Sequence, residues 1–377
     1  MATHPRRLLR RKPSALALGA TLSVSLLLAA CSSTDDADDA ASNTEEDSAT
    51  EQDHAPELLA SHWLETQLTE SDGLLENFGE EDWGITLDSL ISLAAAETGA
   101  DAANATLERF ADEGEEWIDF GTGQVAKAAY TLAVYGENPE DFFDGRDLTS
   151  ELTDAITDEG QIGENSSAFD QAYGILALAK TDTEIPEDAA TWLSDQQCTE
   201  EEEPGNGGYG VPYEDMTECD VADADTTGLV VQALAAVDVD QDAPEIADAL
   251  DWLNGQVNDE GAIEAFGEES ANSTAWAASA FAAFGDDSRD ATSAYLADAL
   301  LTCDDVSDSD ALTEDDIGLV PASSADRDAA ADNGVDEILD GARFATAQTP
   351  IGLTDAGLVD LSADGAEAAS PQPTCDN

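Results

Sequence analysis

The stretch from Trp192 to Ala236 decides the fold: it runs WLSDQQ (192–197), then GNGGYG (205–210), then DADTTGLVVQALAA (223–236). The first segment predicts the end of a helix with one polar face, and the second predicts a glycine-rich loop. The third predicts a helix capped by Asp225 or Thr226, because either side chain can accept hydrogen bonds from the free N–H groups of a first turn. That helix is small and apolar on nearly every side, so it must be buried. One such pair of helices cannot cover its own apolar surface, and the stretch therefore predicts further copies.

The chain contains those copies. Buried-type helices are predicted at 85–96, 124–135, 170–180, 226–236 and 273–284, with equivalent apolar residues at Leu93, Leu132, Leu178, Leu234 and Phe281. A more polar helix is expected before each one, at 56–68, 101–112, 148–157, 187–197 and 243–257. Three of the polar helices share the pattern W-L-x-x-Q, which begins at Trp63, Trp192 and Trp252. Recurrence at intervals of 39 to 56 residues, by subtraction of the equivalent positions, indicates a helical-hairpin repeat.

W-L-x-x-Q, the Gly-Gly-Tyr-Gly loop and the Asp-Thr that opens a small-residue helix resemble the prenyltransferase/squalene-oxidase repeat. The resemblance implies an all-α fold, an α/α toroid of five to six hairpins over residues 56–361, with inner helices around a central cavity. Terpenoid cyclases, protein prenyltransferase β-subunits and transcobalamin-type carriers share this repeat, so the fold does not choose between an enzyme and a carrier. After Phe284 the repeat weakens. Residues 351–361 are the candidate for a sixth inner helix, with five hairpins and a plug as the alternative. Residues 362–377 are expected to form an extended tail that is fixed only if Cys375 is paired.

Residues 1–30 have the features of a secretion signal, with five basic residues followed by an apolar stretch from Ala15 to Ala30. The segment ends Leu28-Ala29-Ala30-Cys31, which is similar to the lipobox of bacterial lipoproteins. The resemblance implies cleavage before Cys31, a diacylglyceryl group on its sulfur, and anchoring on the extracytoplasmic side of the membrane. An ordinary secretion signal with an incidental cysteine is the alternative. Residues 31–55 are acidic and lack large apolar side chains, which predicts a disordered tether.

The chain is strongly acidic, with 12 basic and 85 acidic residues and a formal net charge of −73. Five basic residues lie in the signal, which has no acidic residue, so its removal leaves seven basic against 85 acidic residues, or −78. Without a basic surface the chain cannot displace phosphate counterions, which excludes nucleic acid as a partner. An anionic membrane would repel the body of the protein, which is consistent with a covalent anchor. The charge predicts a salt-tolerant, halophilic surface, and a cation site formed by some of the acids is the alternative.

Four cysteines follow Cys31, an even number that suits an oxidising compartment. Three pairings are possible. We favour Cys198–Cys219, which would staple the glycine-rich loop, together with Cys303–Cys375, which would fix the C-terminal part. No C-x-x-C pair occurs, and the histidines, His4, His54 and His62, lie outside the inner helices. The sequence therefore predicts no metal site and no cofactor, and the zinc that prenyl transfer to a peptide requires is missing.

One interpretation of residues 223–228 is that the protein is an enzyme of the cyclase type. They are similar to the D-x-D-D-T-A motif with which squalene–hopene-type cyclases protonate an alkene, so Asp223 and Asp225 are the candidate catalytic residues and Asp225 the proton donor. Thr226 replaces the family's third aspartate, which weakens the acid cluster. Aromatic residues make up only 6% of the chain, which is few for stabilising carbocations.

A non-catalytic carrier is the interpretation we favour, and a structural or protein-interaction module whose ring is filled by its own side chains is a third possibility. Polar residues at the N-termini of inner helices would surround one mouth of the toroid, with aromatic residues nearby for a ring-bearing ligand, cobalamin or a related corrinoid by analogy. The candidate binding residues are Trp83, Gln124, Asp170, Tyr173, Tyr209, Tyr213, Asp225, Thr226 and Trp276, with Asn272 and Thr274 beside them. An importer complex in the membrane is the expected partner.

Overall fold

The computed structural model describes residues 55–200, 205–211, 218–220, 222–265 and 267–375. The inner helices of the repeat are α2 (Trp83–Ala95), α5 (Thr122–Val134), α7 (Ala168–Lys180), α9 (Ala224–Ala236), α11 (Ala271–Phe284) and α15 (Leu339–Leu353). The helices that precede them are α1 (Pro56–Glu70), α3 (Ala100–Glu113), α6 (Leu148–Asp154), α8 (Glu187–Ser194), α10 (Pro244–Gln256) and α12 (Arg289–Ala299). The predicted hairpins are therefore present, with ends shifted by a few residues.

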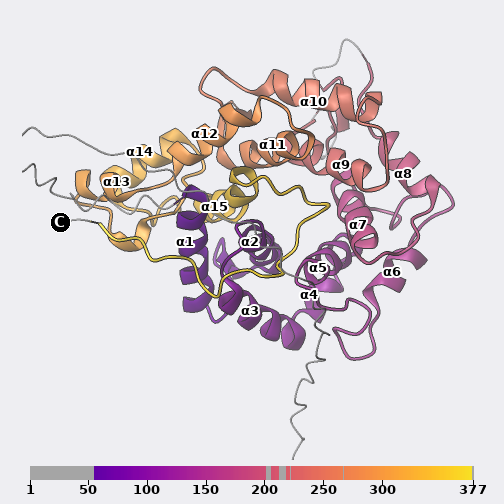
Figure 1. The fold of residues 1–377 in the computed structure, drawn as a ribbon, viewed down its shortest axis with the longest axis horizontal. Helices are drawn as coiled ribbons and strands as arrows, with labels where there is room; N and C mark the ends of the chain where they lie inside the picture. Colours follow the sequence, from indigo (N-terminus) through magenta and orange to yellow (C-terminus); the bar gives the residue numbers. More distant parts are fainter. Residues whose placement is uncertain (1–54, 201–204, 212–217, 221, 266, 376–377) are drawn as a thin grey trace, which may run out of the picture. The chain divides into compact units, whose positions relative to one another are not determined.

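The inner helices form a closed ring. Each packs against the next in the order α2, α5, α7, α9, α11 and α15, and α15 then packs against α2. Figure 1 shows this ring with the other set of helices outside it. The apolar residues that define the repeat, Leu93, Leu132, Leu178, Leu234 and Phe281, are all fully buried. The architecture is the expected all-α toroid, and it has six inner helices.

The sixth inner helix lies earlier in the chain than predicted. The sequence suggested residues 351–361, whereas α15 spans Leu339–Leu353 and continues through Pro350. A proline removes one backbone donor and usually ends or bends a helix. Here the helix ends within one turn of Pro350, so the lost hydrogen bond falls where the helix terminates anyway.

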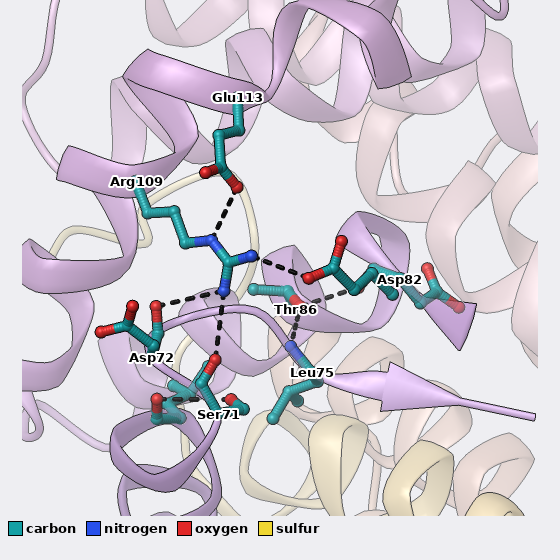
Figure 2. Close-up of polar contacts among 9 residues, drawn as sticks. Ser71, Asp72, Leu75, Asp82, Thr86, Arg109 and Glu113 are labelled. Carbon is teal, nitrogen blue, oxygen red and sulfur yellow. Dashed lines mark hydrogen bonds and ion pairs between the residues drawn. The ribbon is translucent and has the colours of Figure 1, made fainter. Parts of the chain in front are cut away.

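One hydrogen bond recurs between the loop and the inner helix of five hairpins. In the first, the N–H of Leu75 donates to Oγ1 of Thr86 at 3.0 Å, as Figure 2 shows. The side chain on the inner helix is a threonine in four cases and Gln171 in the other. The bonds join Leu75 to Thr86, Ile162 to Gln171, Tyr209 to Thr227, Ile263 to Thr274 and Val320 to Thr346. Each one satisfies a buried backbone donor that would otherwise be costly.

A glycine two residues before each of these loop donors sets the spacing between hairpins. Gly318 has φ +91°, and a Cβ there would lie 2.1 Å from the carbonyl oxygen of Leu59 in α1. Gly207 has φ +97°, and its Cβ would lie 2.7 Å from the carbonyl oxygen of Asp248 in α10. A side chain is excluded by the left-handed conformation and by the neighbouring backbone. Gly318 closes the ring, because it brings the last loop against the first helix.

The C-terminal segment closes the mouth formed by the C-terminal ends of the inner helices. The hydroxyl of Tyr130 donates to the carbonyl of Leu358 at 2.8 Å, and the N–H of Leu358 donates to Oε1 of Gln232 at 2.9 Å. Lys180 donates to the carbonyl of Leu361. Further along, backbone bonds join Ala363 to Val134 and Glu367 to Glu97. Figure 1 shows this yellow segment crossing the ring. Residues 362–375 contain no helix or strand and are held against the body, as expected for a tail whose Cys375 is paired.

Both predicted disulfides are confirmed. Cys198 pairs with Cys219 across the glycine-rich loop, and Cys303 pairs with Cys375, with Cα–Cα distances of 5.4 and 5.5 Å. The second bridge ties the end of the C-terminal segment to α13 (Cys303–Asp308).

The remaining elements are short. Antiparallel hairpins precede two inner helices: β1 (Glu76–Asn77) with β2 (Glu80–Glu81), and β3 (Ile263–Ala265) with β4 (Glu268–Ser270). In the first, Glu76 faces Glu81, and in the second Ile263 faces Ser270. The connecting helices are α4 (Glu115–Ile118), η1 (Glu218–Asp220), η2 (Glu314–Asp316) and α14 (Ser324–Asn333). In the part of the chain that the structure describes, no helix is both long and apolar enough to cross a membrane.

Candidate functional site at the N-terminal mouth of the ring

Capping residues fix the N-terminal ends of the inner helices at the mouth opposite the C-terminal segment. Asp82 caps α2, Ser167 caps α7 in a capping box with Asp170, and Ser270 caps α11. Asp223 caps α9, with its Oδ1 accepting from the N–H of Thr226 at 2.7 Å. The prediction that Asp225 or Thr226 caps this helix is therefore wrong. The backbone of Asp223 is extended because its N–H donates to the carbonyl of Tyr209, which starts the helix two residues early.

A polar group joins four inner helices within the ring. Nζ of Lys127, on α5, lies 2.6 Å from Oδ1 of Asp88, on α2; the Asp88 side chain is buried and that of Lys127 is 13% exposed. Tyr173, on α7, donates its hydroxyl to Asp88 at 3.5 Å. Nε2 of Gln348, on α15, donates to Oδ2 of Asp88 at 3.2 Å. Burying an ion pair costs desolvation that its attraction often does not recover, which makes this group a candidate for function.

Asp225 faces this group from the first turn of α9. Its Oδ2 accepts from Nδ2 of Asn272 at 3.1 Å, and its buried Oδ1 has no hydrogen-bond partner in the structure. Burial raises the pKa of Asp225, hydrogen bonds from the side chains of Ser273 and Asn272 oppose the rise, and the negative charge of Asp88 adds to it. Burial and the nearby Asp225 carboxyl raise the pKa of Asp223 to about 6. The two carboxyls therefore hold their protons at higher pH than exposed aspartates do.

Aromatic rings converge between these polar groups. The ring of Tyr173 lies 5.8 Å from that of Tyr130 and 5.4 Å from that of Phe169, measured between centroids. Phe169 in turn lies 6.1 Å from Trp276, on α11. Nζ of Lys127 lies 5.5 Å from the centroid of Tyr173, within cation–π range. The inside of the ring is thus lined by aromatic and charged side chains as well as by small ones. The aromatic content of the whole chain, 6%, did not reveal this local cluster.

The middle of the ring is filled by side chains. Tyr130, Tyr173 and Trp276 are each at most 1% exposed. By contrast, Gln124, Lys127, Phe169, Asp170, Asp225 and Asn272 are half-buried, so the N-terminal mouth is partly open to solvent. Two surface pockets, of about 530 and 410 Å³, are lined by residues of other elements and lie outside this group. A ligand would therefore enter at the N-terminal mouth and contact the first turns of the inner helices.

The predicted binding residues divide into two groups. Tyr173, Asp225 and Trp276 meet inside the ring, and Gln124 and Asp170 lie at its mouth. Thr226 is buried and its hydroxyl donates to Oδ2 of Asp223. Thr274 supports the loop before α11.

Two other predicted binding residues contact parts of the structure outside the polar group, and a third falls outside the described residues. Tyr209 is fully buried, and its hydroxyl donates to the carbonyl of Glu245 in α10, so it offers no surface to a ligand. Trp83 lines the larger surface pocket. Tyr213 falls outside the described residues, as does Cys31.

Asp88, Lys127 and Gln348 were not predicted. Lys127 carried a usable signal, because it is one of only seven basic residues after residue 30 and lies in an otherwise small, apolar helix. Asp88 is similarly unusual in α2. The described residues contain no group of three or more His, Cys, Asp or Glu side chains placed to hold a metal ion.

Comparison with known proteins supports the fold. No family model and no curated protein matches the sequence. Among solved structures, a protein from Actinoplanes matches with a TM-score of 0.52 at 18% identity, covering 79% of this chain and 98% of that one. The apo type II terpene cyclase MstE from Scytonema matches with a TM-score of 0.51 at 15% identity, covering 80% and 98%. Haptocorrin in complex with Cbi matches with a TM-score of 0.40 at 12% identity, covering 83% and 69%. The fold is an α/α toroid.

Proposed function

We propose that this protein is an extracytoplasmic lipoprotein, anchored through Cys31, that binds a small molecule at the N-terminal mouth of its toroid. The observation that carries the proposal is the set of buried polar atoms without partners on neighbouring inner helices: Oδ1 of Asp225, Nε1 of Trp276 and Oε1 of Gln348. A buried polar atom without a hydrogen bond costs about 1–3 kcal/mol. A ligand that supplies the missing bonds would recover that cost.

The hydrogen-bonding character of these three atoms indicates which chemical groups the ligand carries. Asp225 and Gln348 offer acceptors and Trp276 offers a donor, so the ligand carries both hydroxyl or amide donors and an acceptor. Phe169, which is half-buried at the mouth and packs edge-on against Tyr173 and Trp276, favours an attached ring. Because large side chains fill the middle of the ring, the ligand inserts a polar edge rather than its whole volume. Cobalamin, which the family resemblance suggests, is the first probe.

Binding is tested by native mass spectrometry of the protein extracted from its own membranes, followed by equilibrium dialysis of the purified protein against the retained molecule and against cobalamin. Asp225→Asn should weaken binding about 10- to 150-fold, as expected for a lost charge-assisted hydrogen bond of about 1.5–3 kcal/mol. Asp238→Asn is the matched control, because Asp238 is exposed at the opposite end of the same helix. If nothing is retained and cobalamin does not bind, the mouth is not a ligand site.

The anchor is tested separately. Cys31→Ser should release the protein from the membrane fraction, and the N-terminal peptide of the unaltered protein should carry the mass of a diacylglyceryl group. Two acyl chains are enough for stable anchoring. An unmodified Cys31 in the mature protein, or its loss with the signal, would rule the anchor out.

Cyclisation of a polyene is the second candidate, because Asp225 has a raised pKa and faces aromatic rings. In such a reaction a carboxyl proton adds to an alkene carbon, a C–H bond forms, and the cation on the adjacent carbon is stabilised by ring faces until a proton is lost. Incubation with squalene or a shorter polyene should then yield cyclic products, and Asp225→Asn should abolish them. Binding without product assigns the carrier function.

A further inference from the structure

The larger surface pocket lies outside the ring, between the first two hairpins. It has a volume of about 530 Å³ and is lined by Leu74, Glu81, Trp83, Asp112, Glu113, Glu115, Glu116, Trp117 and Phe120. Small-molecule sites commonly have volumes of about 300–1,000 Å³. None of these residues belongs to the polar group around Asp88 and Asp225, although Trp83 is the first residue of α2.

The aromatic wall of the pocket is pre-organised. Trp83 packs on Phe110 with centroids 4.7 Å apart, and Trp117 contacts the same ring edge-on at 6.3 Å. Phe110 is fully buried and also packs on Phe143, at 5.4 Å. The two indoles are therefore held by a rigid aromatic cluster behind them.

Phe120 is exposed beside this wall. Its side chain is 77% exposed, and in the described part of the chain Phe78 is the other large apolar side chain with comparable exposure. Phe120 lines the pocket, so its ring is an exposed apolar face available to whatever enters there.

The charge of the pocket selects a cation. Arg109 lies 2.8 Å from Oε1 of Glu81 and 2.8 Å from Oε2 of Glu113, and it also donates to the carbonyls of Ser71 and Asp72 (Figure 2). That guanidinium is thus fully engaged. Asp112, Glu115 and Glu116 have no ion-pair partner among the described residues. The pocket therefore keeps uncompensated negative charge beside the rings of Trp117 and Phe120, with the buried Trp83 behind them.

We infer that this pocket binds a small organic cation of the quaternary ammonium class. Aromatic faces attract weakly hydrated organic cations, and nearby carboxylates add to the attraction. The combination of three ring-bearing side chains and unpaired acids at one hollow fits this chemistry, and the volume leaves room for substituents on the ammonium group.

The test is calorimetric titration of the intact protein with choline chloride at constant ionic strength, with 3,3-dimethylbutan-1-ol as the uncharged isostere. Choline should bind one site and the isostere should bind roughly tenfold more weakly or not at all. Phe120→Ala should weaken choline binding about threefold to fivefold, as expected for the loss of one cation–π contact. Phe78→Ala is the matched control, because Phe78 is 75% exposed and does not line the pocket. It should leave binding unchanged.

Equal binding of choline and its isostere would overturn the inference, as would equal effects of Phe120→Ala and Phe78→Ala. If sodium ions occupied the pocket as strongly as choline does, the acids would attract cations only as a nonspecific counterion atmosphere, and the inference would be wrong. Tighter binding of arginine amide than of choline would assign the pocket to a basic peptide instead. Asp225→Asn should not alter choline binding, so the outcome is separable from that of the proposed function.

Discussion

Asp223→Asn should stabilise the protein at neutral pH. Asp223 caps α9 and also carries a carboxyl whose pKa is raised from its ordinary value of 3.8 to about 6 by burial and by Asp225. Asparagine caps a helix as well as aspartate does, and its carbonyl can accept the same bond from the N–H of Thr226. The substitution therefore removes the buried charge while keeping the cap.

The size of the stabilisation expected for Asp223→Asn follows from the shift in the pKa of Asp223. About two pKa units at about 1.36 kcal/mol each correspond to a cost of about 3 kcal/mol when the carboxyl is ionised. Losing a negative charge at a helix N-terminus removes about 0.3–1 kcal/mol of favourable interaction. A net stabilisation of about 2 kcal/mol is expected for the variant above the folded-state pKa.

The pH dependence has a definite sign. Because the folded pKa exceeds the unfolded one, the cost of Asp223 is absent below its unfolded value, grows as pH rises between 3.8 and about 6, and is constant above that. The advantage of the variant should therefore be present at about pH 7.5 and vanish near pH 3.5–4. Asp147→Asn is the control, since Asp147 caps α6 through a hydrogen bond at the protein surface.

Urea unfolding at fixed high salt, followed by tryptophan fluorescence, measures the effect without changing ionic strength. A variant less stable than the unaltered protein at about pH 7.5 would refute the reasoning, because it would mean that the ionised carboxylate stabilises the cap by more than its burial costs. An equal gain at both pH values would point to packing rather than charge.

Three further substitutions and one change of solvent test the fold. Gly318→Ala should destabilise by about 2–4 kcal/mol in urea unfolding, because a Cβ would meet the carbonyl of Leu59; a neutral result would mean that α1 moves freely. Thr227→Val should cost about 1–3 kcal/mol in the same assay by leaving the N–H of Tyr209 without a partner, and no loss would imply a substitute acceptor. Lys127→Met should cost about 3–5 kcal/mol because Asp88 is left buried and unpaired, with part of the loss recovered by adding Asp88→Leu; additive losses would contradict this coupling. Melting temperature should rise from millimolar to molar NaCl as self-repulsion is screened, and salt-independent melting would count against the halophilic interpretation.

Much of the fold followed from periodicity, because each inner helix is buried on nearly all sides and each outer helix on one. The positions of α7 and α9 matched their predicted runs at the C-terminal ends and began two residues earlier. The disulfides were predictable because Cys198 and Cys219 flank one loop. The end of the ring was harder, since Pro350 interrupts the pattern of α15 and splits one helix into two apparent segments.

The site was less predictable, because it depends on which side chains face one another across the ring. Asp223 and Asp225 satisfy the same local capping pattern, and the backbone bond from Asp223 to Tyr209 decides between them. Asp88 and Gln348 are 260 residues apart, so no local spacing relates them. Tyr209 belongs to the most conspicuous motif, yet it packs outward onto α10 to support the loop rather than a ligand.

The contact between Gly318 and Leu59 has a consequence for biogenesis. Until α15 has been synthesised, α2 lacks a neighbour on one flank, and an incomplete ring exposes apolar helix surface at both ends. A chain truncated before α15 therefore has no closed core to fold around and should be degraded by proteases far faster than the full-length protein. The last inner helix is thus the step that commits each molecule to its folded state.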